Sequence, residues 1–382
     1  MIQTIFKNNI FLFGVIPVCI LYVWRYLHTK GWLSYADTNA NKAILAKCPT
    51  ILKGTFTPTI YLQHDLLQTM FSSFVSSNSS KLSYIIEEVD MKGGGHTSLA
   101  WAQHNGQYKN DKKSKVLVVI IPGLTGGAKD EYIKDLVNRL CDAGYKCVVY
   151  HPRFNGSQLI LPDEGHLDIL SDFKTTIEHI KDKEKDIKLF GIGHSYGANL
   201  LLNYLGTFNQ ENHFIGAVSL ANPYNLMLAE NKMRRSVVDR VVTNFLQKTT
   251  NRSTEGLKKA VRFKLNLEEL QSFKTVRDFD RNFTIKVYGY ETVNDYYWGI
   301  SSCRRMQSIK IPLFMLQAED DPIVDSKAFV KEEIEKYNPN VILMMTQKGG
   351  HQGWVEGLFS LKRWYLRPTL EFVNAVVDFA NV

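Results

Sequence analysis

The sequence predicts an α/β fold built on a mostly parallel, doubly wound sheet, and three observations lead to this class. Short apolar segments alternate with helical patterns along most of the chain after residue 115. Residues 115–121 read KVLVVII, a continuous run typical of a strand buried on both faces. With 45% hydrophobic and 22% charged residues, the 382-residue chain also has an ordinary globular composition, which excludes disordered and collagen-like classes.

An apolar segment without charge stands near the beginning of the chain. The 17 residues from Asn8 to Trp24 carry no charge and are bracketed by Lys7 and Arg25, a length at the short end of what spans a bilayer. A cleaved signal peptide is disfavoured because no small-x-small site follows, and a buried helix of the globular body is the other alternative. We expect an uncleaved membrane anchor in residues 1–30, with its orientation left open by basic residues on both sides.

The elements of the body follow in order. Strands are expected in residues 83–103 (two, around the turn Gly93–Gly95), 115–121, 145–150, 187–192, 214–221, 312–317 and 341–345. Helices are expected from Asp130, over 170–182, from 196, between the last two strands, and from about Leu370. In a sheet of this kind the functional site lies at the carboxyl ends of the strands.

A nucleophile candidate stands between the strand at 187–192 and the helix that follows it. The sequence Gly193-His-Ser-Tyr-Gly197 is a G-x-S-x-G pattern in the strand–turn–helix context that raises a serine hydroxyl above the sheet. Glycine at the two outer positions lets strand and helix pass closely. A tight turn with an idle serine is the alternative, whereas a dinucleotide fingerprint is excluded because its third glycine would fall on Tyr196. Ser195 is therefore the expected nucleophile.

A serine nucleophile needs hydrogen-bond donors for the negative oxygen of its tetrahedral intermediate. In this strand–turn–helix context one donor is the backbone N–H of the next residue, here Tyr196. The second comes from the loop after an earlier strand, and residues 122–127, PGLTGG, occupy that place. Pro122 has no N–H to give, so Leu124 is the expected donor, with a simple flexible connection as the alternative.

An acid and a histidine follow the serine in the order Ser, acid, His. Asp321 lies in the sequence AEDDP after the strand at 312–317 and fits the spacing to Pro322 better than Asp320, which we interpret with Glu319 as a solvated acidic turn. His351 lies between glycines after the strand at 341–345. A surface histidine is its alternative. The expected triad is Ser195, Asp321 and His351.

Six stretches together resemble a known family. They are PGLTG at 122–126, GHSYG at 193–197, LLNYLG at 201–206, RDFDRNFT at 277–284 with YGY at 288–290, AEDDP at 318–322, and GGHQGWVEG at 349–357. These are similar to the fourth AB-hydrolase family, which includes bacterial YheT-like esterases, plant embryogenesis-associated hydrolases and animal membrane-anchored phospholipases. The resemblance covers roughly residues 55–375. It implies an α/β-hydrolase fold whose triad falls on Ser195, Asp321 and His351.

The same resemblance points to one branch of the family. Bacterial members usually have His-Gly where this chain has Pro122-Gly123, and the Pro form resembles the animal phospholipase branch. That branch implies a single-pass N-terminal anchor of type II, with the endoplasmic reticulum as a candidate compartment. The hydrolase domain is then expected over residues 55–382.

Residues 226–305 interrupt the sheet before the acid strand and are expected to form a helical cap. Between Asn231 and Lys264 ten Lys or Arg residues stand against two acids, a balance of +8 that equals the net charge of the whole chain. This suits an anionic lipid surface, and a solvated helical face is an equal alternative. Nucleic acid is discounted because no reader motif is present. An aromatic cluster in the cap either lines an acyl pocket or packs in its core: Tyr288, Tyr290, Tyr296, Tyr297 and Trp298.

The motifs and the resemblance together predict a membrane-anchored serine hydrolase that cleaves carboxylic esters of lipids, with phosphatidylcholine-like glycerophospholipids as the expected substrates. Neither a cofactor nor a metal is expected, because the five Cys form no CxxC pair and the triad chemistry requires none. The alternatives are a neutral-lipid or short-chain carboxylesterase, an acyltransferase, and a catalytically silent lipid-binding module. Acyl-chain length, headgroup and oligomeric state are left open.

Overall fold

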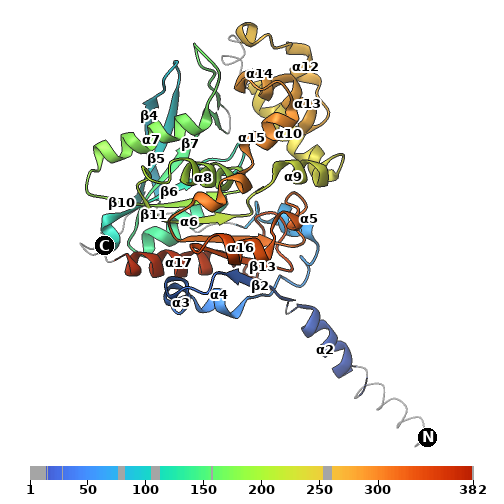
Figure 1. Cartoon of the computed structure of the whole chain (residues 1–382). Coiled ribbons are helices and arrows are strands. Elements are labelled where there is room, and N and C mark those ends of the chain that lie inside the picture. The colour runs from blue at the N-terminus through green and yellow to red at the C-terminus, as the bar shows by residue number, and fades with distance from the viewer. Residues whose placement is uncertain are drawn as a thin grey trace, which may run out of the picture.

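A nine-stranded sheet forms the centre of the computed structural model, which describes residues 14, 16–27, 29–75, 82–104, 112–155, 158–252 and 260–380 (Figure 1). The order is β2-β13-β12-β11-β10-β6-β7-β5-β4. The strands are β2 (Trp32–Tyr35), β4 (Leu82–Asp90), β5 (His96–His104), β6 (Val116–Ile121), β7 (Lys146–His151), β10 (Lys188–His194), β11 (Phe214–Leu220), β12 (Leu313–Ala318) and β13 (Val341–Thr346). From β7 to β13 neighbouring strands are parallel, whereas β2, β4 and β5 are antiparallel at the edges. The mostly parallel sheet predicted from the sequence is confirmed.

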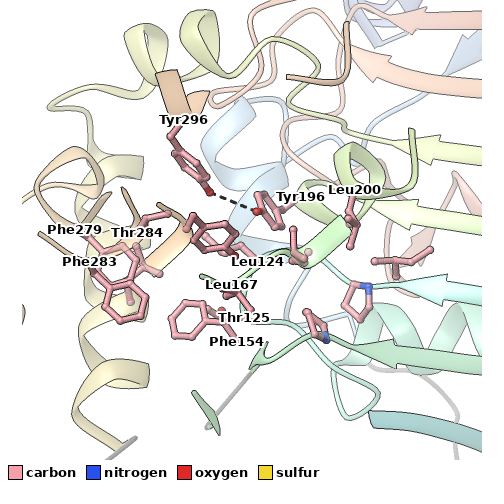
Figure 2. Close-up of a pocket in the computed structure, with 18 residues that line it drawn as sticks. Leu124, Thr125, Phe154, Leu167, Tyr196, Leu200, Phe279, Phe283, Thr284 and Tyr296 are labelled. Carbon is pink, nitrogen blue, oxygen red and sulfur yellow. Dashed lines mark hydrogen bonds between the residues drawn. The ribbon is translucent and has the colours of Figure 1, made fainter. Parts of the chain in front are cut away.

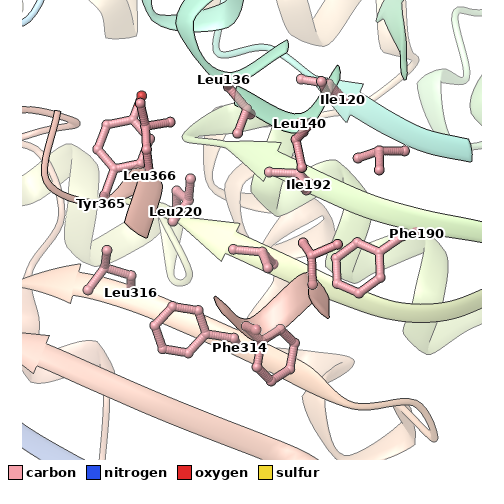
Figure 3. Close-up of a cluster of buried hydrophobic side chains, with 14 of the residues drawn as sticks. Ile120, Leu136, Leu140, Phe190, Ile192, Leu220, Phe314, Leu316, Tyr365 and Leu366 are labelled. Atoms are coloured by element: carbon pink, nitrogen blue, oxygen red, sulfur yellow. The ribbon is translucent and has the colours of Figure 1, made fainter. Parts of the chain in front are cut away.

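Helices cover both faces of the sheet, which is why its central strands are apolar throughout. On one face α6 (Glu131–Asp142) and α17 (Leu366–Phe379) pack in the larger core, and Figure 3 shows Leu136 and Leu140 of α6 among side chains of neighbouring strands. On the other face lie α7 (Ile169–Lys183), α8 (Tyr196–Thr207) and α16 (Lys331–Tyr337). Each central strand therefore contributes alternate residues to two separate cores.

The last helix begins at Leu366, four residues before the expected start at Leu370. Pro368 is its third residue. Proline is compatible with the first turn because the first four N–H groups of a helix have no partner inside the helix. The proline therefore belongs to this helix and does not delay its start.

The body also begins earlier than the expected boundary at residue 55. Strand β2 pairs antiparallel with β13, while α3 (Asn39–Leu45) and α4 (Pro49–Lys53) contribute Ile44 and Ile51 to the larger core. The side chain of Asn41 donates to the carbonyl of Pro339, which ties this segment to the far end of the chain. Four residues of strand carry too little alternation to be recognised alone, because their partner lies about 300 positions away.

The N-terminal helix α2 (Ile16–Leu27) extends away from the body (Figure 1). Four of its apolar side chains are exposed: Ile16, Val18, Ile20 and Val23. Residues 1–13, 15 and 28 of the expected anchor lie outside the described residues. No helix in the described part of the chain has the length and apolar character needed to cross a bilayer, so the anchor prediction is not supported there.

The segment between β11 and β12 forms a group of helices beside the sheet (Figure 1). They are α9 (Leu226–Met233), α10 (Val237–Arg252), α12 (Leu267–Ser272), α13 (Val276–Phe279), the π-helix η4 (Asp280–Thr284), α14 (Ile285–Tyr288) and α15 (Val293–Ile300). Phenylalanines of α13 and η4 pack with Leu161 and Leu167 of the body in a separate apolar cluster. These helices lie where the sequence analysis expects the cap.

Candidate active site

The turn after β10 holds Ser195 in a strained backbone conformation. Its φ of 51° and ψ of −120° lie where residues other than glycine are rare. A side chain at Gly193 would place Cβ 2.4 Å from the Cα of Ala198, and one at Gly197 would place it 2.2 Å from the carbonyl oxygen of Pro122. Both glycines of the motif are therefore required for the close approach of strand, helix and neighbouring loop.

Ser195, His351 and Asp321 are joined by hydrogen bonds. Nε2 of His351 lies 2.8 Å from Oγ of Ser195, and Nδ1 lies 2.8 Å from Oδ2 of Asp321. The Asp321 side chain is fully buried, and its other oxygen accepts the backbone N–H groups of Ile323 and Val324 at 2.8 and 2.9 Å. One carboxylate oxygen is thus held by the backbone while the other faces the imidazole.

The loop 122–127 lies directly against Ser195, because a Cβ added at Gly123 would lie 3.5 Å from Cβ of Ser195. The N–H of Gly123 donates to the hydroxyl of Tyr132 at 3.1 Å, so this group is already engaged. Leu124 and Tyr196 line the same pocket as Gly123, next to Ser195. This arrangement is compatible with Leu124 and Tyr196 as the oxyanion donors, which remain a prediction.

Asp320 differs from its expected role as part of a solvated acidic turn. It is largely buried, and its Oδ1 accepts the backbone N–H of Gly350 at 2.9 Å. Burial raises the pKa of its carboxyl group to about 6, against the lowering effects of this hydrogen bond and of Lys348. Glu319 is exposed, as expected, and accepts a hydrogen bond from the indole of Trp32. Asp320 therefore holds the loop that carries His351 rather than pointing into water.

A short helix that the sequence analysis missed, α5 (Asp65–Phe71), holds the other side of the histidine loop. The hydroxyl oxygen of Thr69 accepts the backbone N–H of His351 at 2.9 Å. The buried Gln68 side chain accepts the N–H of Val355 at 2.7 Å and donates to the carbonyl of Leu62 at 2.8 Å. A seven-residue helix gives a weak periodic signal, and its partner loop lies more than 280 residues away.

His194, the neighbour of Ser195 in sequence, packs its ring against two tyrosines. Its fully buried ring contacts the edges or faces of Tyr132 and Tyr365 at centroid distances of 5.0 and 5.7 Å. Burial, with smaller contributions from Arg363 and His351, lowers the pKa of His194 to about 3. The ring is therefore neutral at physiological pH and packs as an aromatic group. Neither of its nitrogens has a hydrogen-bond partner among the described residues, so the ring is not positioned as a second base at Ser195.

An apolar pocket lies between the turn that follows β10 and the cap (Figure 2). Its walls are mainly aliphatic and aromatic, and include Phe154, Leu167, Leu246, Phe279 and Phe283. The hydroxyl groups of Tyr196 and Tyr296 lie 3.4 Å apart across it, joining α8 to the cap.

Members of the aromatic cluster of the cap meet both outcomes that the sequence left open, and Trp298 meets neither. Tyr288 and Tyr296 line the pocket. Tyr297 is buried and donates to Asp280 at 2.6 Å, whereas Trp298 is about half exposed. Burial raises the pKa of Asp280 to about 6, against the hydrogen bonds from Tyr297 and Thr284.

Several arginines of the cap pair with acidic groups or carbonyl oxygens of the protein itself. Arg234 forms a two-point ion pair with the buried carboxylate of Glu230, at 2.6 and 2.8 Å, and Arg277 approaches the same group. Arg262 donates to the carbonyls of Pro162 and Gly165.

Among the residues that the structure describes, no group of three or more His, Cys, Asp or Glu side chains is arranged to hold a metal ion.

The fold and the serine-centred site define the chain as a serine ester hydrolase. More particularly, residues 116–358 match the model of the alpha/beta hydrolase fold family, and the chain belongs to this family. It is 27% identical to the mouse (Mus musculus) protein named Phospholipase ABHD3, over 98% of this chain and 92% of that protein. This similarity over almost the full length confirms the resemblance to the animal phospholipase branch.

Two further comparisons extend this result. The Monoacylglycerol lipase of Saccharomyces cerevisiae is 27% identical over 72% of this chain and 62% of its own length. The solved acylaminoacyl peptidase of Pyrococcus horikoshii aligns with a TM-score of 0.51 at 14% identity, covering 77% of this chain and 42% of that one. At this identity the structural match establishes the fold alone.

Proposed function

We propose that this protein is a membrane-associated lipase that hydrolyses carboxylic ester bonds of glycerophospholipids. The observation that carries the proposal is the hydrogen-bonded series Asp321–His351–Ser195 beside an apolar pocket. The relationship to the mouse phospholipase supports the substrate class. The proposed hydrolase domain holds the cap at 226–305 as an insertion.

In the proposed reaction His351 removes the proton of Ser195 through Nε2 as Oγ attacks the acyl carbonyl carbon. The carboxylate of Asp321 keeps the proton of the imidazole on Nδ1 and stabilises the imidazolium that forms. The backbone N–H groups of Leu124 and Tyr196 stabilise the oxyanion. His351 then protonates the leaving alcohol, and water activated by the same histidine releases the fatty acid.

The pocket beneath the cap is the proposed acyl site. Its apolar walls meet the oxyanion loop at Leu124, so a chain bound there would present its ester carbonyl to Ser195. Phe279 and Phe283 stack with a centroid distance of 5.0 Å, which gives the cap side of the pocket a rigid apolar wall. Such a wall suits an unbranched hydrocarbon chain better than a polar substrate.

We further propose that the apolar segment 8–24 keeps the enzyme at a membrane. The exposed side chains of α2 support this, because a helix that projects from the body with apolar residues in water gains free energy by entering lipid. A neutral-lipid ester is the second candidate substrate, favoured by the relationship to the yeast monoacylglycerol lipase.

The test is labelling of the full-length protein with a fluorophosphonate probe, followed by turnover of phosphatidylcholine and of monoacylglycerol. Ser195→Ala should abolish labelling. Ser219→Ala is the matched control, because Ser219 is buried on the neighbouring strand β11, its hydroxyl has no hydrogen-bond partner among the described residues, and its loss should leave labelling unchanged. A folded wild-type protein that is not labelled would refute the proposal, and faster monoacylglycerol turnover would favour the second candidate.

A further inference from the structure

A group of exposed apolar side chains surrounds α5 and the loop after the catalytic histidine. They come from two segments far apart in sequence, and we call them the α5 surface: Ile60, Tyr61, Met70, Phe74, Leu358 and Phe359. Phe359 is 95% exposed and Phe74 75% exposed, and the other four are each at least half exposed. Isolated apolar side chains are common on protein surfaces, but six on two adjoining segments form a patch that calls for a partner.

The two segments are held together from below. Leu62, Val75 and Val355 form a small buried cluster under the surface. The hydroxyl of Tyr61 donates to the carbonyl of Leu358 at 3.0 Å, and that of Thr59 donates to a neighbouring carbonyl in the same loop. The backbone that carries the exposed apolar side chains is therefore fixed by these hydrogen bonds, and the apolar residues next to them are already buried in the cluster.

A short antiparallel strand pair links the segment of the α5 surface to the helix that projects from the body. Helix α2 leads into β1 (Thr29–Lys30), which pairs with β3 (Thr55–Phe56), and Ile60 follows only four residues later. The exposed apolar side chains of α2 and those of the α5 surface thus start from the same small antiparallel pair. Figure 1 shows α2 leaving the body on the side where α5 lies.

Charge also marks this surface as one that faces lipid. Asp65 is the only Asp, Glu, Lys or Arg between residues 57 and 75, and residues 357–361 contain none. Exposed Lys53 lies four residues before the first segment and exposed Lys362 directly after the second, while Glu356, directly before the second, is paired with Arg367. An apolar centre with lysines at its border matches the boundary between hydrocarbon and headgroups.

We propose that the α5 surface inserts into a phospholipid bilayer and forms a second membrane contact beside α2. This inference rests on the proposed lipase function, because it supplies the route by which a membrane lipid reaches the site. Helix α5 lies directly against the histidine loop: a side chain at Gly350 would place Cβ 2.5 Å from the carbonyl oxygen of Asp65, and Thr69 accepts the N–H of His351. Insertion would therefore place the bilayer next to the catalytic machinery.

The first experiment measures insertion directly in the full-length protein. The indole introduced by Phe359→Trp should be quenched on phosphatidylcholine vesicles containing brominated acyl chains, measured as the difference from the wild-type emission. Ile85→Trp is the matched control, because Ile85 is 59% exposed on β4, at the opposite end of the sheet, and the indole placed there should not be quenched. The proposal would be overturned if the Phe359→Trp variant is not quenched, or if its new indole is already shielded from water by the chain's own first residues before vesicles are added.

The second experiment measures the consequence for turnover. Phe74→Asp with Phe359→Asp should lower hydrolysis of vesicle lipid by about tenfold or more, while hydrolysis of a soluble short-chain ester is unchanged. Ile85→Asp should alter neither rate. Unchanged vesicle turnover in the double variant would refute the inference, and if that variant does not fold, the two tryptophan variants decide.

These readouts separate this inference from the proposed function. If the Phe359→Trp variant is quenched but the wild type does not turn over lipid, membrane insertion of the α5 surface is supported and the proposed lipase function is refuted. If the wild type turns over lipid but the Phe359→Trp variant is not quenched, the proposed lipase function is supported and membrane insertion of the α5 surface is refuted.

Discussion

Replacing Asp321 with asparagine tests how the candidate catalytic histidine is oriented. In the native site Oδ1 accepts the N–H groups of Ile323 and Val324, and Oδ2 faces Nδ1 of His351. An asparagine has only one acceptor oxygen. If that oxygen keeps the two backbone hydrogen bonds, the amide NH₂ group points at Nδ1, and the imidazole proton must move to Nε2. In that tautomer Nε2 donates to Ser195 and cannot accept its proton.

The size of the effect follows from the cost of turning the amide round. The reversed amide leaves the part-buried N–H of Ile323 and the buried N–H of Val324 without an acceptor, at about 1–3 kcal/mol each, or about 2–6 kcal/mol together. Since 1.4 kcal/mol is about tenfold, between about one molecule in 30 and one in 10⁴ would hold the productive orientation. We therefore expect kcat of Asp321→Asn to fall by about 30-fold to 10⁴-fold, with KM little changed.

The assay is hydrolysis of a soluble p-nitrophenyl ester, with thermal unfolding as the check on folding. Asp320→Asn is the control, because Asp320 bonds the N–H of Gly350 and does not contact the imidazole. Its activity should fall less than about tenfold, since asparagine can still accept that hydrogen bond. Full activity of Asp321→Asn, or a larger loss in Asp320→Asn, would refute the assigned roles of the two acids.

Three further predictions follow from the same contacts. Gly197→Ala should lower kcat by more than about 100-fold and reduce the melting temperature, because its Cβ would displace the carbonyl of Pro122 and with it the loop 122–127, the proposed source of an oxyanion donor; unchanged kinetics would contradict this assignment. Thr69→Val should lower kcat by about tenfold with KM unchanged, because the N–H of His351 loses its acceptor; Thr69→Ser should restore the rate, and a failure to do so would exclude positioning through the hydroxyl. Asp280→Asn should flatten the dependence of stability on pH, measured as melting temperature from pH 4 to 7.5. The pKa of Asp280 is raised by burial to about 6, so the folded state binds this proton more tightly, and its stability falls as pH rises from about 4 to 6, by up to about 3 kcal/mol. If the melting temperature of the asparagine variant depends on pH as steeply as that of the wild type, the pH dependence arises from another titrating group.

The sequence alone determined the sheet and the order of the chemical groups. Buried parallel strands are apolar on both faces, so β6 and β13 could be recognised as continuous apolar runs. Ser195, Asp321 and His351 each follow such a strand, and the ends of parallel strands meet at one edge of a sheet. The need for glycine on both sides of the serine turn is also visible in the sequence as Gly193 and Gly197, because a side chain at either position would clash with neighbouring backbone.

Only the tertiary structure decided which groups support these residues. The hydrogen bond from His351 to Thr69 spans 282 positions, and β2 pairs with a strand about 300 residues away. The spacing to Pro322 already favoured Asp321 as the partner of the imidazole, but only the packed loops show that Asp320 is largely buried and bonds the histidine loop. A sequence pattern records what each residue requires of its own neighbours. Contacts between distant short segments depend on which surfaces meet when the chain folds, and no local pattern records that.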